Sequence, residues 1–216
     1  MNELFLEKRR LAPFLAIACA LSILPTAALA NDVTVGGVLG LTNARVDSQN
    51  PLEADGLTTS RKLGVGASVT LGFHEAADPL GLQIGAWYLH RKFEIDDSSL
   101  RVVRTVPTLL VPVELKFFPT GILSVSGGGF AAFRIGDATD EVQLGNTSLF
   151  SFSSAQRKST EFGLTLAAEA EIPVAPMTGF IAEARYWRGL SNSADNSVFN
   201  EKIDDLTLML GLRFGM

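Results

Sequence analysis

Two long stretches of alternating side chains, joined by a short turn, occupy the region between Arg104 and Ile135. The first stretch, RTVPTLLVPVELKFF, has an aliphatic or aromatic residue at almost every second position. This is the period of a β-strand, because successive side chains point to opposite faces. The second stretch, ILSVSGGGFAAFRI, alternates in the same way. Between them, Pro119-Thr120-Gly121 predicts a tight turn, in which Pro fixes φ and Gly supplies a positive φ.

Both predicted strands are about 12 residues long, whereas a strand of a globular domain usually has about five or six. One face of each strand is aliphatic, and the other carries small or charged side chains such as Ser126, Glu114 and Lys116. Strands of this length and pattern are typical of a barrel wall that crosses a lipid bilayer. The hairpin therefore predicts a membrane barrel to which the rest of the chain supplies further strands.

The same alternation recurs along the chain and predicts eight strands, an even number as in barrels of bacterial outer membranes. The predicted strands are 33–42, 61–73, 80–93, 104–118, 122–135, 160–172, 179–190 and 206–214. Long polar loops are predicted at 43–60, 94–103, 137–159 and 191–205, and short turns at 74–79, 119–121 and 173–178. Long and short connections alternate, as they do between the extracellular and periplasmic ends of such barrels. The predicted fold is all-β: an eight-stranded antiparallel up-and-down transmembrane β-barrel.

The first 30 residues have the pattern of a cleaved secretory signal peptide, which leaves residues 31–216 as the outer-membrane barrel domain. A basic start, an apolar stretch and the small-residue site Ala28-Leu29-Ala30 follow one another in the expected order. Two other routes are lipoprotein cleavage before Cys19 and twin-arginine export through Arg9-Arg10. Cleavage after Ala30 is favoured, because a membrane barrel must be exported unfolded and because lipoprotein processing would leave a strongly apolar start.

The composition agrees with a membrane barrel and argues against two other classes of protein. Hydrophobic residues make up 47% of the chain and the mean hydropathy is +0.25. The mature part nevertheless has no run of about 18 apolar residues, the length that a transmembrane helix requires. The net charge of -5 and the lack of a basic stripe argue against binding to nucleic acid.

Alternation alone does not say which face points outward, because a soluble lipocalin-like barrel would put its aliphatic face inside and bind a hydrophobic ligand there. The polar face of this chain is rich in Gly, Ser, Thr and Ala, which suits the crowded interior of a narrow barrel. A solvated face would carry more Lys and Glu in the middle of its strands. These features predict that the aliphatic face contacts the lipids of the outer membrane.

A set of charged residues shares the polar face, in the halves of the strands that lie near the short turns. We expect them to form an ion-pair network that plugs the periplasmic half of the lumen, because a buried charge is costly unless it is paired. The alternative is that some of them line a wet cavity. The residues are Glu114, Lys116, Glu169, Glu171, Glu183, Arg185 and Arg213.

Four other residues have consequences for the wall and the lumen. Pro107 and Pro112 have no N–H to donate, and a closed barrel has no free edge to accommodate them, so we expect a bulge or an interrupted ladder there. Trp87 and Phe130 face inward and should fill a lumen that is already narrow in an eight-stranded barrel. An open pore is therefore not expected.

Five segments carry a more specific signal: VPTLLVPVELKFF (106–118), SVSGGGFAAFRIG (124–136), EFGLTLAAEAEIP (161–173), EARYWRGLSN (183–192) and LMLGLRF (208–214). They resemble successive strands of the bacterial outer-membrane protein beta-barrel domain family, the PorT-like "porin family" of small barrels. The resemblance implies a small barrel in the outer membrane of a Gram-negative bacterium, inserted there by the barrel assembly machinery.

Few residues suggest chemistry. The mature chain has two histidines, His74 and His90, and no cluster with metal-ligand spacing, so neither a metal nor another cofactor is expected. Lipid A deacylases of the outer membrane carry a Ser and a His close together near the end of a strand. Here Ser191 lies near such an end but has no adjacent His, and a serine nucleophile needs a base. A lipid-modifying hydrolase is therefore kept only as an alternative. The prediction is a non-enzymatic protein with a structural or surface-interaction role, which presents polar loops to a ligand that the residues do not identify.

Overall fold

The computed structural model describes residues 33–48, 58–74, 79–97, 100–144, 147–154, 160–191 and 201–215. The predicted signal peptide, residues 1–30, and its cleavage site lie outside these ranges. In the part of the chain that is described, no helix has the length and apolar character needed to cross a membrane.

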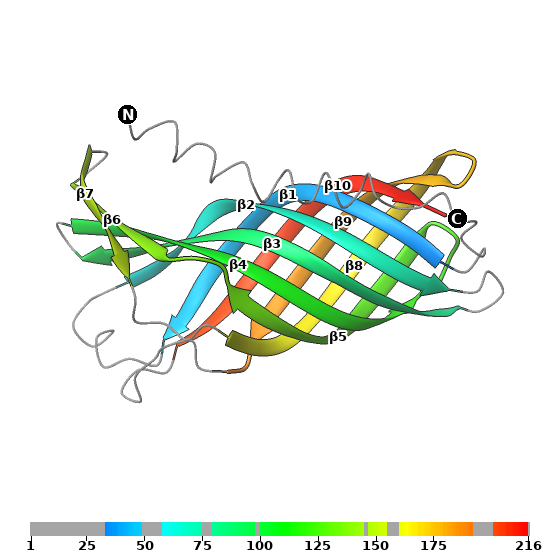
Figure 1. Ribbon diagram of the computed structural model, residues 1–216, viewed down its shortest axis with the longest axis horizontal. Helices are drawn as coiled ribbons and strands as arrows, with labels where there is room; N and C mark the ends of the chain where they lie inside the picture. Colours follow the sequence, from blue (N-terminus) through cyan, green and yellow to red (C-terminus); the bar gives the residue numbers. More distant parts are fainter. Residues whose placement is uncertain are drawn as a thin grey trace. The chain divides into compact units, whose positions relative to one another are not determined.

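Eight strands close into one antiparallel barrel, which confirms the predicted fold (Figure 1). The order around the wall is β3-β2-β1-β10-β9-β8-β5-β4, and β4 pairs with β3 to complete the circle. The barrel strands are β1 (Val33–Ser48), β2 (Thr58–His74), β3 (Leu80–Asp97), β4 (Leu100–Phe117), β5 (Leu123–Arg134), β8 (Thr160–Ala175), β9 (Thr178–Gly189) and β10 (Glu201–Phe214).

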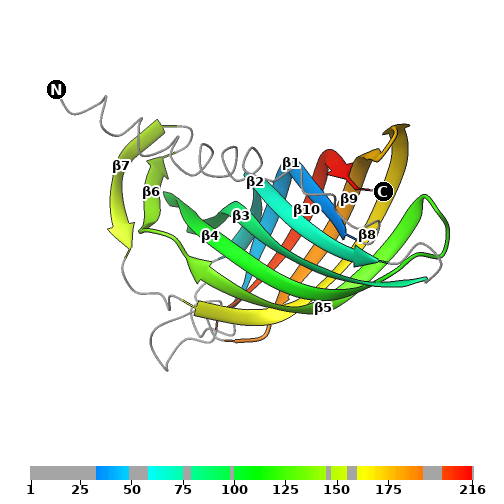
Figure 2. The same ribbon diagram turned by 45° about the vertical axis from the view of Figure 1, so that its right-hand side comes forward.

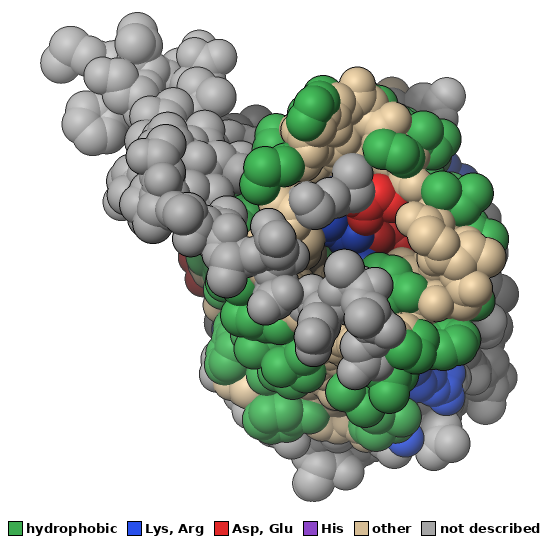
Figure 3. Space-filling model, turned by 90° about the vertical axis from the view of Figure 1, so that its right-hand side faces the viewer, with side chains coloured by type: hydrophobic (Ala, Val, Ile, Leu, Met, Phe, Trp, Pro, Cys, Tyr) green, Lys and Arg blue, Asp and Glu red, His purple; other side chains and the backbone are tan. Residues whose placement is uncertain are grey.

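The aliphatic faces of these strands point outward. Leu39, Leu115 and Leu166 are 64%, 68% and 63% exposed, whereas the neighbouring Glu114 and Lys116 are buried. Figure 3 looks into the end of the barrel that carries the short turns: acidic and basic side chains lie in the opening and hydrophobic side chains surround it. A soluble barrel requires the opposite arrangement, so the lipocalin-like alternative is wrong.

Several strands extend further toward the long-loop end than the sequence predicted. β3 continues to Asp97 and β4 begins at Leu100, so most of the predicted loop 94–103 is a paired hairpin. The predicted loops 43–60 and 191–205 are also too long, because β1 ends at Ser48, β2 begins at Thr58 and β10 begins at Glu201. Beyond the bilayer neither face of a strand meets lipid, so charged and polar residues can occupy both faces and the apolar alternation is lost.

The predicted loop 137–159 contains a second hairpin, formed by β6 (Ala138–Leu144) and β7 (Thr147–Ser154). β6 pairs with residues 101–105 of β4, next to the stretch of β4 that pairs with β5. Gly136 has a φ of 87°, and this left-handed conformation lets the chain change direction between β5 and β6. Figures 1 and 2 show the hairpin beyond one end of the barrel wall, so the prediction of a single long loop is wrong.

The two prolines of β4 lie where its ladders are interrupted, as the sequence predicted. Pro112 pairs with Phe130 of β5, but the ladder between β3 and β4 has no pairs for residues 111 and 112, although its register does not change. Pro107 lies where the partner of β4 changes from β5 to β6, and its carbonyl accepts a hydrogen bond from the N–H of Ile135 at 3.0 Å. Each missing N–H therefore falls at a gap in the pairing.

The turn between β4 and β5 closes in a way that the sequence did not predict. Gly121 is not among the residues with a positive φ. Instead, the Thr120 hydroxyl oxygen accepts hydrogen bonds from the backbone N–H groups of Ile122 at 3.4 Å and Leu123 at 3.0 Å. A threonine side chain thus holds this turn, which is a role that hydroxyl residues often take in turns.

Candidate functional site in the barrel lumen

Arg185 of β9 contacts two carboxylates inside the barrel. Its Nε and Nη2 groups donate hydrogen bonds to the two oxygens of Glu183, each at 2.9 Å. Its Nη1 group donates to Glu114 of β4 and, at 3.2 Å, to the hydroxyl oxygen of Thr165. The side chains of Arg185, Glu114 and Glu183 are at most 3% exposed, so this arrangement satisfies the guanidinium in a site away from bulk water.

Glu169 of β8 is the centre of a second cluster, in which its carboxylate contacts the two cationic side chains of Lys116 and Arg213. Lys116 Nζ donates to Glu169 Oε1 at 2.7 Å, and Arg213 Nη1 and Nη2 donate to its two oxygens at 2.5 and 2.7 Å. Arg213 Nη1 also donates to Glu171. These contacts bring together the four charged residues that the Arg185 cluster does not include.

Gln83 of β3 joins the two clusters. Its amide nitrogen donates to Glu114 Oε2 at 3.3 Å, and its amide oxygen accepts from Lys116 Nζ at 3.3 Å. Gln83 and Thr165 were not part of the predicted network because neither carries a charge. The alternation of their strands nevertheless places both on the inward face. We call these two residues and the seven charged ones the ionic layer.

The ionic layer contains four carboxylates, Glu114, Glu169, Glu171 and Glu183, and three cationic groups. One negative charge is therefore in excess when all groups are ionised. Glu171 is the most exposed of the four carboxylates, with 12% of its side chain accessible, against 5% or less for the others. Glu171 shares Arg213 with Glu169, and its Oε1 is buried without a hydrogen-bond partner in the described part of the chain, so the excess negative charge lies at the Glu169–Glu171 end of the layer.

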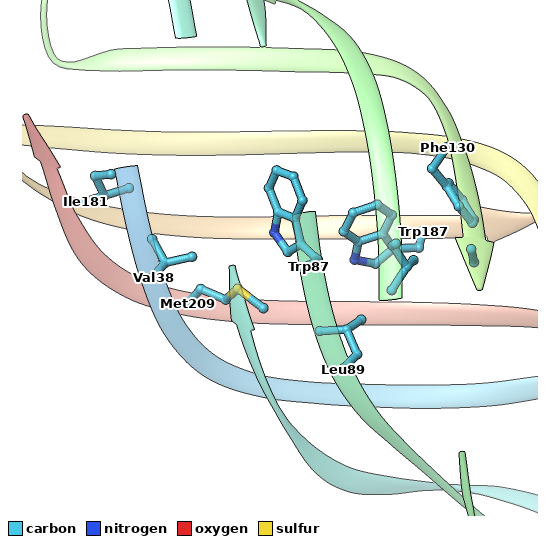
Figure 4. Close-up of a cluster of buried hydrophobic side chains, with 9 residues drawn as sticks. Val38, Trp87, Leu89, Phe130, Ile181, Trp187 and Met209 are labelled. Carbon is cyan, nitrogen blue, oxygen red and sulfur yellow. The ribbon is translucent and has the colours of Figure 1, made fainter. Parts of the chain in front are cut away.

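An aromatic layer follows the ionic layer along the lumen, and Figure 4 shows the side chains of this aromatic layer. The rings of Trp87 and Trp187 meet edge to face with centroids 5.7 Å apart, and Phe130 meets Trp187 at 5.3 Å. The Arg185 guanidinium lies 4.5 Å from the centroid of Trp87 and 5.1 Å from that of Trp187, so cation–π contacts connect the two layers. The aromatic layer consists of the buried side chains of Val38, Trp87, Leu89, Leu110, Phe130, Ala132, Ile181, Trp187 and Met209.

Two glycines make room for these rings. A Cβ on Gly85 would lie 2.3 Å from an atom of the Trp87 ring, and a Cβ on Gly163 would lie 2.5 Å from the ring of Phe130. Both distances are too short for real atoms, so only glycine fits at either position. The small residues of the polar face therefore serve to accommodate large side chains from other positions on the wall, as a narrow barrel requires.

A second polar cluster lies on the long-loop side of the aromatic layer, and the sequence did not predict it. Arg91 is fully buried and donates from Nε to Asp205 at 2.8 Å and from Nη1 to Glu161 at 3.3 Å. The Thr42 hydroxyl also donates to Asp205. Asp205 falls in the predicted loop 191–205, but β10 begins at Glu201, and this earlier start turns Asp205 into the lumen. Further out, four buried apolar side chains follow: Ala44, Val106, Ala138 and Ile203.

The residues of the hydrolase alternative are separated and engaged elsewhere. The Ser191 hydroxyl accepts a hydrogen bond from the backbone N–H of Phe162 at 2.8 Å. His90 lies on β3 and contacts the Tyr88 hydroxyl through Nε2 at 2.6 Å. Three strands, β2, β1 and β10, stand between β3 and β9 in the wall, so Ser191 and His90 do not form a nucleophile–base pair. His74 lies at the end of β2.

In the described ranges, no group of three or more His, Cys, Asp or Glu side chains could hold a metal ion.

A family model of the outer membrane protein beta-barrel domain matches residues 25–195. The chain belongs to this family. Proteins of this family are outer-membrane barrels, so this chain lies in the outer membrane and its strands cross the bilayer. The outward aliphatic faces described above agree with this location.

Solved outer-membrane barrels are similar to this family member at low sequence identity. Ail, the attachment invasion locus protein of Yersinia pestis, is 16% identical, with 85% of this chain and 99% of that chain covered and a TM-score of 0.45. Neisserial surface protein A is 16% identical over 85% and 97% of the two chains, with a TM-score of 0.42. OprG from Pseudomonas aeruginosa is 13% identical over 85% and 94%, with a TM-score of 0.45. No curated protein matches the sequence.

Proposed function

We propose that this outer-membrane barrel is closed to solutes and that it acts at the cell surface without enzymatic activity. The acting part is an extracellular extension, formed by residues 92–97 of β3, residues 100–105 of β4, and the hairpin of β6 and β7. The observation that carries the proposal is the succession of side-chain layers in the lumen. The ionic layer, the aromatic layer and the Arg91 cluster occupy successive levels between the short turns and the long-loop end. A solute would have to displace each of them in turn.

The side chains that fill the lumen make closure more favourable than gating. The interior of an eight-stranded barrel is about as wide as the side chains that fill it. Moving an ion through the ionic layer would separate buried charge pairs, and leaving one partner of such a pair alone costs about 3–5 kcal/mol. The aromatic layer offers few polar groups to replace the water that a permeating ion loses. Outer-membrane lipids are then the partner of the wall, and the extension beyond the wall is the part that can meet other molecules.

The extension is a folded element rather than a set of loops. In the outer parts of β3 and β4, residues 92–97 pair with residues 100–105, and β6 and β7 continue the sheet beside β4. Arg104 holds β6 to β4 through Asp140, with Nε and Nη2 donating to the two carboxylate oxygens at 2.5 and 2.6 Å. A paired and bridged sheet presents a defined surface, as an interaction role requires.

Conductance in planar lipid bilayers tests the proposal. Protein whose folding has been verified should insert without stepwise conductance, because the seal is built from wall residues. A variant in which a short Gly-Ser linker replaces residues 137–159 should remain closed as well, since the ionic and aromatic layers stay intact. Regular conductance steps in the unmodified protein would contradict closure. Steps in the shortened variant alone would place the seal in the extension instead of the wall.

A further inference from the structure

Two arginines at the outer end of the lumen, Arg91 of β3 and Arg134 of β5, have guanidinium groups whose hydrogen bonding is incomplete. Arg91 is fully buried and donates to Asp205 and Glu161, but its Nη2 is buried without a hydrogen-bond partner. Arg134 also has a buried Nη1 without a partner, and it forms no hydrogen bond or ion pair with the described residues. A buried donor on a charged group is costly to leave unsatisfied, so two of them in one region indicate a missing acceptor.

The registers of the strands bring the two guanidinium groups to the same part of the lumen. Arg91 and Arg134 pair with positions of β4 that are two residues apart, and such positions share one face of a strand. Arg91 Nη1 contacts Glu161 of β8 at 3.3 Å, and Glu161 pairs with Ala132, which precedes Arg134 by two residues on β5. The Arg91 side chain therefore reaches across the lumen to the strands around Arg134.

The charges of this region determine which acceptor fits. Asp205 and Glu161 bond to Arg91 rather than to Arg134, so Arg134 keeps a donor for another group. Two carboxylates already balance the two guanidinium groups when all are ionised, and a ligand with one negative charge is therefore favoured over a ligand with two. Charged N–H donors form their strongest hydrogen bonds with anionic oxygens. A carboxylate meets these conditions, because it has a single charge and one oxygen for each free donor.

The two arginines lie at the rim of the barrel, above a closed floor. β5 ends at Arg134, whereas the pairing of β3 with β4 continues beyond Arg91 to Asp97 (Figure 1). The wall is therefore lower at Arg134, whose side chain is half-buried. On the inner side, Leu89 and Ala132 of the aromatic layer precede the two arginines on the inward faces of their strands.

We propose that Arg91 and Arg134 bind one carboxylate group of an extracellular ligand, in a site that we call the outer arginine site. One oxygen of the ligand accepts a hydrogen bond from Arg91 Nη2, and the other accepts from Arg134 Nη1. Glu161 lies beside the site and disfavours dianions such as sulfate through its like charge. The inference rests on the proposed closure, because a sealed lumen lets a ligand reach these arginines from the extracellular side only.

A titration with sodium acetate tests the proposal, followed by NMR of protein with 15N-labelled arginine side chains in lipid nanodiscs. The side-chain signals of Arg91 and Arg134 should shift with acetate and reach a plateau, whereas sodium chloride at the same ionic strength should not move them. Arg134→Gln removes one of the two donors, so the acetate affinity read from the Arg91 signal should fall about tenfold. Arg101→Gln is the matched control, because the 41% exposed Arg101 side chain bonds to Glu94 outside the site. It should leave the affinity unchanged.

Glu161→Gln separates ligand binding from an internal ion pair between Arg134 and Glu161. In the outer arginine site this substitution should tighten acetate binding, because it removes a like charge. An unmodified protein whose Arg134 signal ignores acetate would overturn the proposal, and so would a response to acetate in Glu161→Gln alone, because Arg134 would then pair with Glu161. Tighter binding of sulfate than of acetate would overturn the assignment to a carboxylate.

The conductance measurement keeps this inference distinguishable from the proposed function. A protein that neither conducts nor binds acetate would reject the outer arginine site and leave the proposed function standing. A protein that binds acetate and also conducts would reject closure and leave the carboxylate site standing.

Discussion

Replacing Arg185 by methionine should lower the free energy of unfolding by about 3–5 kcal/mol, because it leaves buried carboxylates without their cation. Arg185 is fully buried, donates to both oxygens of Glu183 and also donates to Glu114. Its guanidinium lies over the rings of Trp87 and Trp187 as well, so the substitution also removes the cation–π contacts between the two layers.

Urea unfolding of the barrel in lipid vesicles measures this effect. The matched control is Arg101→Met: Arg101 donates to Glu94 at 2.9 Å, but its side chain is 41% exposed and lies outside the bilayer. Arg101→Met breaks a pair whose basic side chain is 41% exposed and whose acidic side chain is 11% exposed, so the control should lose less stability than Arg185→Met. If Arg185→Met lowered the free energy of unfolding no more than Arg101→Met does, water would reach the ionic layer. Its charges would then line a wet cavity, which is the alternative that the sequence left open.

Leu166→Arg should destabilise the membrane-inserted barrel by about 2–4 kcal/mol, because it places a cation among lipid chains near the middle of the bilayer. Leu166 is 63% exposed and lies in the middle of β8, where it pairs with Gly127 of β5 and Tyr186 of β9. In a soluble barrel an exposed leucine would tolerate arginine, since the side chain would enter water.

Ile122→Arg is the control for this substitution. Ile122 is 55% exposed, similar in chemistry to Leu166, and belongs to the turn between β4 and β5. Arginine costs about 0–1 kcal/mol near the membrane interface, so this variant should keep most of its stability. Equal effects of the two substitutions in lipid vesicles would mean that residue 166 does not lie at the depth that the fold implies.

The sequence predicted the wall because the bilayer imposes the pattern that sequence reasoning uses. Each membrane-spanning strand must present apolar residues to lipid at every second position, and the same period places Glu114, Lys116 and Arg185 inside. The alternation places the seven charged residues on the inward face, near the same end of their strands, so the sequence predicts that they lie close together. It does not predict which of them pair, because the pairs depend on the stagger between neighbouring strands.

The parts that sequence reasoning missed lie where the bilayer no longer imposes that pattern. The segments 94–103 and 137–159 are charged or rich in Ser and Thr, and this composition suggested loops although both contain paired strands. The Arg91–Asp205 pair is not predicted for the same reason, since Asp205 lies in the predicted loop 191–205. Gln83 is absent from the predicted network because it carries no charge, although the alternation of β3 places it on the inward face.

The central claim, a closed barrel in the outer membrane, is tested most directly by fractionating cells and comparing the mobility of boiled and unboiled protein on SDS gels. In a closed barrel every strand is hydrogen-bonded on both sides, so the folded form should resist the detergent until it is heated. We expect the protein in the outer-membrane fraction, with a mobility that changes on boiling. A protein in the soluble periplasmic fraction, with the same mobility before and after boiling, would contradict the account.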